Sequence, residues 1–265
     1  MIAPRGPLAV RTLLILALAG CDTPPVAWSA VRSLPASSGI VRLTGNGDIV
    51  ADSLVAINVE THLPAPACPG SIRYARDGAS LVAVWWSPRP DSSASLVFSR
   101  KRYGAEWGVV VPVDTTDRGV TGCRRSPPAV TADSATRYIH VSYGLVGVEG
   151  PGIFFSHSMD AGALFHSPVS IVYGEHIGAT SVASDGDRVA VAFEDPNGGA
   201  ARIGLALSRT MGHIFEDRIL PVSADNGSAT QPLVAIRGRT IAVAWQERAG
   251  SAGIAAFRVR TGSLH

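Results

Sequence analysis

The chain has 265 residues, of which 46% are hydrophobic and 17% are charged, and its formal net charge is +2. This length accommodates one large β domain or two ordinary domains. The small net charge and the scattered basic residues argue against nucleic acid or an anionic membrane surface as a partner, because both require a concentrated basic patch.

The N-terminus has the features of an export signal. Arg5 and Arg11 form a positively charged region before a short apolar segment, residues 13–18, which is too short to span a membrane. The sequence Leu-Ala-Gly-Cys follows at residues 18–21 and resembles the lipobox of bacterial lipoproteins. The resemblance implies removal of residues 1–20, lipidation (palmitate among the acyl chains) of Cys21, and anchoring in the bacterial cell envelope, facing the periplasm or the exterior. An ordinary cleaved signal peptide is the alternative.

Residues 21–39 are rich in Pro, Ser and Ala, which is typical of a flexible tether. The organisation predicted from the sequence is therefore a signal peptide over 1–20, a tether over 21–39 and one folded domain over 40–265.

Within that domain, one segment recurs four times at intervals of 50 to 57 residues, which indicates a repeat architecture. Each copy alternates side chains in the manner of a strand, contains β-branched residues and ends in an aromatic residue. The four copies are Val82–Trp86, Ile139–Tyr143, Val189–Phe193 and Ile241–Trp245.

Three further strands are predicted in each of the first three copies, and two in the fourth. A first strand precedes a tight turn, marked by Asp77-Gly78 and Asp185-Gly186, because glycine tolerates the positive φ of a hairpin. A third strand follows the aromatic-ended segment. A fourth contains a Pro-Val pair, which suits a sheet edge because proline lacks an N–H. The Pro-Val pairs are Pro112-Val113, Pro168-Val169 and Pro221-Val222. The sequence therefore predicts an all-β fold, a propeller of four-stranded antiparallel blades.

The fourth copy ends before any fourth strand, so an N-terminal strand is expected to complete the last blade. Residues 39–43 and 54–60 are the two candidates for that strand. A truncated chain, an open arc and a degenerate extra blade near residues 40–65 are the alternatives.

With Cys21 lipidated, Cys68 and Cys123 remain, and an exported chain favours a disulfide between them. Each cysteine lies just before the first strand of its copy, and equivalent loops of neighbouring repeats lie on one face. Two unpaired thiols are the alternative.

The segment from Ser158 to Phe165 resembles the Asp-box, Ser-x-Asp-x-Gly-x-x-aromatic, of bacterial sialidases and related propellers. Ser158, Asp160, Gly162 and Phe165 match it, the third copy keeps a weaker form, and the first a looser one. The resemblance spans residues 69–265. In that family these boxes are structural and peripheral, so Asp160 is expected to stabilise a turn rather than to act as a catalytic acid or a Ca²⁺ ligand.

The sialidase resemblance implies three arginines that clamp a carboxylate, a tyrosine nucleophile assisted by a glutamate, and an acid/base aspartate. The family's early Arg-Ile-Pro motif is absent, so no catalytic residue is assigned. Tyr173 and Glu175 are a faint counterpart of the nucleophile pair. Topology places the following charged loop residues on a candidate binding face: Arg89, Arg124, Arg125, Glu175, Glu194, Asp195, Glu247 and Arg248.

Seven histidines show no metal-ligand spacing, His157 and His166 flank a turn, and His140 stands where other copies have Ala. No metal or cofactor is predicted. The leading hypothesis is a membrane-anchored lipoprotein with a sialidase-like propeller that binds a carbohydrate or an envelope protein without catalysis. The alternative is an exo-acting glycoside hydrolase of the sialidase type.

Overall fold

The computed structural model describes residues 23–35, 41–52, 63–224, 228–249 and 254–265. Within these ranges every regular element is a β-strand, and no helix is long and apolar enough to cross a membrane. The predicted signal peptide, the predicted lipidation site at Cys21 and the candidate strand at 54–60 lie outside the described residues.

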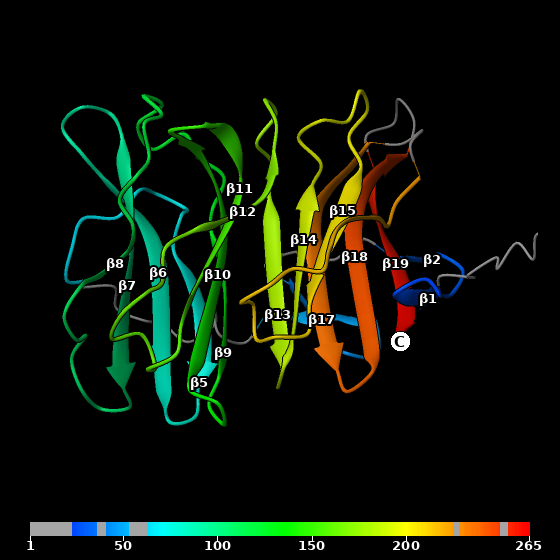
Figure 1. Ribbon diagram of the computed structural model, residues 1–265, viewed down its shortest axis with the longest axis horizontal. Helices are drawn as coiled ribbons and strands as arrows, with labels where there is room; N and C mark the ends of the chain where they lie inside the picture. Colours follow the sequence, from blue (N-terminus) through cyan, green and yellow to red (C-terminus); the bar gives the residue numbers. More distant parts are fainter. Residues whose placement is uncertain (1–22, 36–40, 53–62, 225–227, 250–253) are drawn as a thin grey trace, which may run out of the picture.

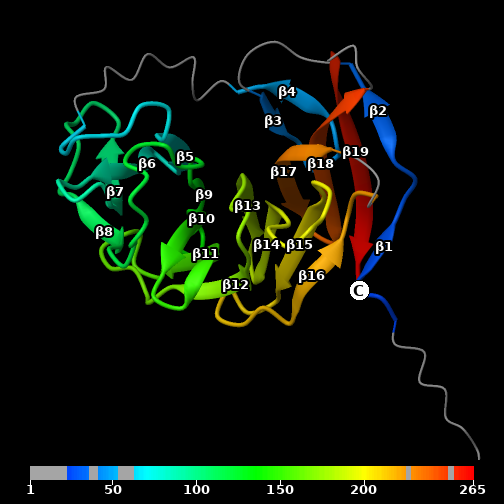
Figure 2. The same cartoon turned by 90° about the horizontal axis from the view of Figure 1, so that it is seen from above.

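Figure 1 shows the strands standing side by side, and Figure 2 shows the sheets arranged around a common axis as the blades of a propeller. This confirms the predicted fold class. Blade one consists of β5 (Arg73–Asp77), β6 (Ser80–Pro88), β7 (Ala94–Arg102) and β8 (Val111–Asp114). Blade two consists of β9 (Ala129–Asp133), β10 (Tyr138–Gly147), β11 (Gly150–Ser158) and β12 (Val169–Tyr173). Blade three consists of β13 (Thr180–Asp185), β14 (Arg188–Glu194), β15 (Ile203–Ser208) and β16 (Asp217–Pro221). Blade four contains β17 (Ala229–Arg237), β18 (Thr240–Ala249) and β19 (Ile254–Leu264), completed by β1 (Val26–Trp28) and β2 (Arg32–Leu34).

The aromatic-ended segments are the second strands of the blades, and they are buried on both faces. In β14, Val189, Val191 and Phe193 pack into one hydrophobic cluster, while Ala190 and Ala192 pack into another. The large side chains meet blade two and the small ones meet blade four. Burial of a Val or Phe side chain contributes roughly 1.5–3 kcal/mol, so these strands supply much of the stability of the propeller.

The tight turns between first and second strands have the predicted backbone geometry. Gly78 and Gly186 adopt φ values of 58° and 60°. Gly238 takes the same role in blade four with φ of 57°, and in blade two the non-glycine residue Arg137 has φ of 65°. The Pro-Val segments lie where proline is tolerated, because β8, β12 and β16 are the outer strands of their sheets.

An N-terminal segment closes the last blade, as predicted, but a different segment from the two candidates. Val26–Trp28 pairs antiparallel with Leu264–Gly262, and Arg32–Leu34 pairs with Val259–Phe257, along the outer edge of β19. The prediction of a flexible tether over 21–39 is therefore wrong for β1 and β2, and the domain begins earlier than residue 40. The open edge of β19 provides backbone partners that the composition of the segment does not reveal.

The candidate strand at 39–43 forms a separate small sheet. Here β3 (Val41–Leu43) pairs with β4 (Ile49–Ala51), and β3 contacts β17 and β18 of blade four. This two-stranded sheet stands in the position of a further blade beside blade four (Figure 2). It corresponds to the degenerate extra blade that the sequence left open.

Candidate binding face

The propeller has two ends with different connections. The loop end collects the links between second and third strands and between successive blades, and lies at the top of Figure 1. The turn end, at the bottom, collects the hairpins between first and second strands and between third and fourth strands. The loop end comprises 88–94, 115–128, 147–150, 174–179 and 195–202, and the turn end comprises 77–80, 103–110, 133–138, 159–168, 185–188, 209–216 and 237–240.

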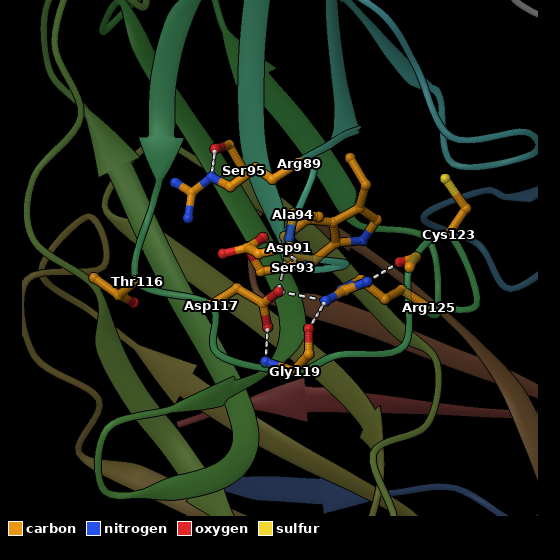
Figure 3. Close-up of polar contacts among 12 residues, drawn as sticks. Arg89, Asp91, Ser93, Ala94, Ser95, Thr116, Asp117, Gly119, Cys123 and Arg125 are labelled. Carbon is orange, nitrogen blue, oxygen red and sulfur yellow. Dashed lines mark hydrogen bonds and ion pairs between the residues drawn. The ribbon is translucent and has the colours of Figure 1, made fainter.

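Asp117 is the centre of a buried polar network at the loop end of blade one (Figure 3). Its carboxylate accepts hydrogen bonds from the backbone N–H groups of Ala94, at 2.9 Å, and Gly119, at 3.1 Å. It also pairs with Arg125, whose guanidinium donates to the carbonyl oxygens of Gly119 and Gly122. The side chains of Arg125 and Asp117 are 6% and 2% exposed. Arg125, predicted for the binding face, is therefore enclosed and holds the loop together.

Arg89 is also engaged by its own blade. Its Nε donates to Ser95 Oγ at 2.8 Å, and its Nη2 donates to the carbonyl oxygen of Thr115 at 3.0 Å. Beside it, Asp91 accepts hydrogen bonds from the hydroxyl and the N–H of Ser93, and these bonds lower the pKa of the Asp91 carboxyl. The loop at 88–94 is thus a polar turn that is tied to the following loop at 115–128.

Asp114 is a second buried carboxylate that the sequence analysis missed. It accepts a hydrogen bond from the hydroxyl of Tyr143 at 2.7 Å, across the interface between blades one and two. Complete burial, followed by the charge of Asp114, raises the pKa of Tyr143 well above its usual value. The ring of Tyr143 meets Trp86 edge-on, and Arg125 lies over the Trp86 ring. The sequence does contain a signal for these buried carboxylates: Asp114 and Asp117 closely follow the Pro112-Val113 pair of blade one.

A disulfide between Cys68 and Cys123 joins the segments that enter blades one and two, as predicted. The backbone N–H of Cys68 also donates to the carbonyl oxygen of Trp86 at 2.8 Å. Arg124, next to Cys123, is exposed, and its side chain makes no hydrogen bond or ion pair within the described part of the chain. Of the three arginines predicted here, Arg124 alone is available to a ligand.

In blade three, the predicted acidic residues have separate roles. Asp195 is buried and pairs with Arg202 at 2.6 Å. Glu194 accepts a hydrogen bond at 2.8 Å from the N–H of Gln231, and this bond links blades three and four. Glu175 is exposed and has no such partner among the residues that the structure describes.

In blade four, Glu247 forms an ion pair with Arg258 at 2.7 Å. The backbone of Arg248 pairs with Ala255 in the β18–β19 ladder, and its side chain lies outside the described atoms. The eight predicted residues make no hydrogen bond or ion pair with one another in the described structure. They are spread over the loop end rather than gathered into one cluster.

Tyr173 has a carboxylate partner, but it is not the one expected from the sequence. Its hydroxyl donates to Glu149, in the turn between β10 and β11, rather than to Glu175. Both side chains are exposed, and the ring of Tyr173 lies edge-on to Phe154 with 5.8 Å between centroids. A solvent-accessible tyrosine–glutamate pair is thus present at the loop end of blade two.

Two valines at the loop end are strongly exposed: Val120 is 77% and Val148 is 68% exposed. Their segments meet where the N–H of Arg118 donates to the carbonyl oxygen of Val146 at 2.9 Å. The exposed surface between blades one and two therefore combines apolar groups with the free cation of Arg124.

The turn from Ser158 to Phe165, at the turn end of blade two, is closed by its own side chains. Ser158 Oγ donates to Asp160 at 2.6 Å and accepts from the N–H of Gly162 at 2.8 Å. Asp160 accepts a further hydrogen bond from the N–H of Leu164 at 3.0 Å. The hydrogen bond from Ser158, and to a smaller extent that from the N–H of Leu164, lower the pKa of the Asp160 carboxyl. Phe165 packs against Phe98 of blade one, so the turn joins two blades.

Four histidines gather between blades two and three at the turn end. The ring of His157 stacks on that of His166 with 4.8 Å between centroids, and it meets His213 edge-on at 4.6 Å. The ring centroids of His140 and His157 are 6.4 Å apart, and the Tyr138 hydroxyl lies within hydrogen-bond distance of His213 Nε2. The sequence analysis missed this cluster because its members are far apart in the chain. An alignment of the turns of successive blades could have suggested it.

Each of the two inner histidines, His140 and His157, has a buried ring nitrogen without a hydrogen-bond partner. His140 Nε2 lies 3.1 Å from the carbonyl oxygen of Met211, whereas His140 Nδ1 and His157 Nε2 are buried without a hydrogen-bond partner. Burial lowers the pKa of His140 to about 4, and burial together with the neighbouring histidines lowers that of His157 to about 4. Across the described ranges, no group of three or more His, Cys, Asp or Glu side chains is arranged to hold a metal ion.

No protein-family model and no curated protein sequence matches the chain. Among solved structures, it is similar to the Hadza microbial sialidase Hz136, with 16% identity and a TM-score of 0.49, over 68% of this chain and 42% of that one. It is also similar to a mutant of the NanB sialidase from Streptococcus pneumoniae, with 12% identity and a TM-score of 0.49, over 76% and 31% of the two chains. A third is the Bacteroides ovatus protein GH43B, with 13% identity and a TM-score of 0.47, over 74% and 39%. The matched regions make up less than half the length of each of these proteins.

Proposed function

We propose that the chain is a lipid-anchored protein of the bacterial cell envelope whose propeller docks another envelope protein at its loop end without catalysing a reaction. The resemblance of residues 18–21 to a lipobox supports anchoring through Cys21. The disulfide between Cys68 and Cys123 is consistent with an oxidising, extracytoplasmic location. Likewise, the resemblance of residues 158–165 to an Asp-box supports a sialidase-like propeller.

The observation that carries the proposal is a fixed loop that exposes apolar side chains. The buried Asp117–Arg125 pair and the disulfide fix residues 115–128, while Val120 remains 77% exposed. A rigid loop loses little conformational entropy on binding, so exposed apolar area on it favours association. Valine offers a sugar neither a hydrogen bond nor an aromatic face, and this favours a protein partner over a carbohydrate at this end.

The docking proposal is tested with the full chain, affinity-tagged and solubilised from membranes. Val120→Asp is expected to lower recovery of a co-purified envelope protein by at least about tenfold, because it places a charge in the apolar contact. Val109→Asp is the matched control: Val109 is 82% exposed but lies at the turn end. Equal recovery with both variants, or equal loss with both, contradicts docking through the loop end.

Anchoring is tested separately by Cys21→Ser. The variant is expected to move from the membrane fraction to the soluble fraction, because it removes the residue that would carry the acyl chains. Retention of the variant in membranes contradicts the lipid anchor and leaves the docking proposal unaffected.

One observation favours the alternative of a sialidase-type glycoside hydrolase. The Tyr173 hydroxyl donates to the Glu149 carboxylate, which is the pairing that activates a tyrosine nucleophile in that class. This hypothesis predicts hydrolysis of a sialoside that Tyr173→Phe abolishes.

A further inference from the structure

A hollow of about 650 Å³ lies at the turn end, between blades one and two. It is walled by the hairpin at 77–80, the end of β7 and the following residue Tyr103, and the turn between β9 and β10. The turn at 158–165 adds Ala161, whose N–H donates to the carbonyl oxygen of Arg137 at 2.9 Å. Its volume falls in the range of roughly 300–1,000 Å³ that small-molecule sites occupy. The hollow belongs to neither the loop end nor the histidine cluster.

The walls of this hollow are positively charged. Three arginines line it, with Asp77 as the single acidic residue. Asp77 is 5% exposed and lies 2.7 Å from Arg100 Nη2, so that pair is neutral overall. Arg102 and Arg137 are exposed, and neither side chain makes a hydrogen bond or ion pair within the described structure. Two uncompensated positive charges, one from each blade, therefore border the hollow.

Guanidinium groups are suited to one kind of ligand group. Each can donate two parallel hydrogen bonds to a carboxylate or a sulfate, which a lysine cannot do. Arg102 ends β7 and Arg137 lies in the turn between β9 and β10, so each blade contributes one guanidinium group to the lining of the hollow. An anion bound by both groups would be held by both blades.

An aromatic side chain adds an apolar surface at the same place. Tyr103 borders the hollow and is 97% exposed, so its ring packs against almost nothing in the protein. Tyrosine provides a large, rigid contact area with a polar hydroxyl at low entropic cost. A free anion such as sulfate would make no use of that ring, whereas the apolar face of a sugar ring would.

We propose that the hollow binds an oligosaccharide that carries acidic groups, with Arg102 and Arg137 holding the carboxylate or sulfate and Tyr103 stacking on a sugar ring. This site is independent of protein docking at the loop end. It gives the propeller two binding surfaces, one at each end of blades one and two.

The test is a calorimetric titration of the purified protein with trigalacturonic acid, a sulfated disaccharide and maltotriose, at low ionic strength. At least one acidic sugar is expected to bind, and neutral maltotriose is not. Arg102→Ala and Arg137→Ala should each weaken the binding by about tenfold, because each removes a charge-assisted pair of hydrogen bonds. Tyr103→Ala should weaken it by about threefold, through lost stacking. Arg42→Ala, an exposed arginine of β3, is the matched control and should bind normally.

Four results would overturn the proposal. They are no binding of either acidic sugar, equal binding of maltotriose, equal loss in Arg42→Ala, and binding of inorganic sulfate as tight as that of the sugars with no effect of Tyr103→Ala. Loss of binding in Arg124→Ala with full binding in Arg102→Ala would place the ligand at the loop end, and would also refute this site. Failure here leaves the Val120→Asp result unchanged, because the two surfaces lie at opposite ends.

Discussion

At the loop end of blade one, the ion pair of Asp117 and Arg125 is enclosed by the protein, whereas at the turn end of the same blade the pair of Asp77 and Arg100 borders an open hollow. Asp117 and Arg125 are both nearly inaccessible to solvent, at 2% and 6% side-chain exposure. The corresponding turn-end pair, Asp77 and Arg100, keeps the arginine 33% exposed. The difference follows from the connections: the long loop at 115–128 folds over the Asp117–Arg125 pair, whereas the two-residue hairpin at 78–79 is too short to cover Arg100.

The largest expected effect comes from removing the covalent link of the loop end. Replacing Cys68 and Cys123 with serine should lower the free energy of unfolding by about 4 kcal/mol, because the disulfide closes a long loop in the unfolded chain. The two cysteines are 55 residues apart. Denaturant unfolding of the wild type with and without reductant gives a parallel measurement. An unchanged midpoint in both would show that the loop end is held by its polar network alone.

The effects of Asp117→Asn and Asp77→Asn on the free energy of unfolding compare the two ends directly. Asp117→Asn should lower the free energy of unfolding by about 3–4 kcal/mol, because it leaves the Arg125 guanidinium buried without a counter-charge. Asp77→Asn should have a clearly smaller effect, because water reaches a third of Arg100 and screens its charge. The measurement is urea unfolding of both variants. Equal losses would contradict the contrast between an enclosed and an open end.

A smaller effect is expected from pH, and it concerns the turn end of blades two and three. His140 and His157 have folded-state pKa values of about 4, below the unfolded value of about 6.5. Between these values the unfolded state binds more protons, so stability falls as pH decreases from about 6.5 to about 4. For His140 the full loss is on the order of 3 kcal/mol at pH 4 and below.

Unfolding measured from pH 7 to pH 4 tests this, with His140→Ala as the informative variant. The other blades carry Ala83, Ala190 and Ala242 at the same position of the strand, so alanine suits the local geometry. The variant should show a shallower pH dependence, and exposed His176→Ala should not. An unchanged slope in His140→Ala would assign the pH dependence to the carboxylates instead.

The sequence predicted the blades because each second strand carries its signal locally, in an alternation that ends in Trp, Tyr or Phe. The tight turns were predictable for the same reason, because the glycine of an Asp-Gly pair tolerates the positive φ that such a turn requires. The closing strands were misassigned because Val26–Trp28 and Arg32–Leu34 are too short to alternate. They form strands because they pair with the outer edge of β19, which would otherwise be open.

The candidate site was less predictable, because its interactions join residues distant in the chain. The position of Arg125 near the loop end followed from topology, but its burial depends on Asp117, whose carboxylate the sequence does not orient. The pairing of Tyr173 with Glu149 rather than with Glu175 depends on how β10, β11 and β12 align. Only the disulfide was predictable as a pair, because just two cysteines remain after residue 21.

We propose above that the loop end binds a partner and performs no hydrolysis. Incubating the wild type and Tyr173→Phe with a fluorogenic sialoside, and measuring the released fluorophore, distinguishes binding from hydrolysis. We expect that neither protein exceeds the rate of a heat-denatured sample, although both remain folded. Turnover by the wild type that Tyr173→Phe abolishes would contradict it, and would establish the Tyr173–Glu149 pair as the nucleophile of a glycoside hydrolase.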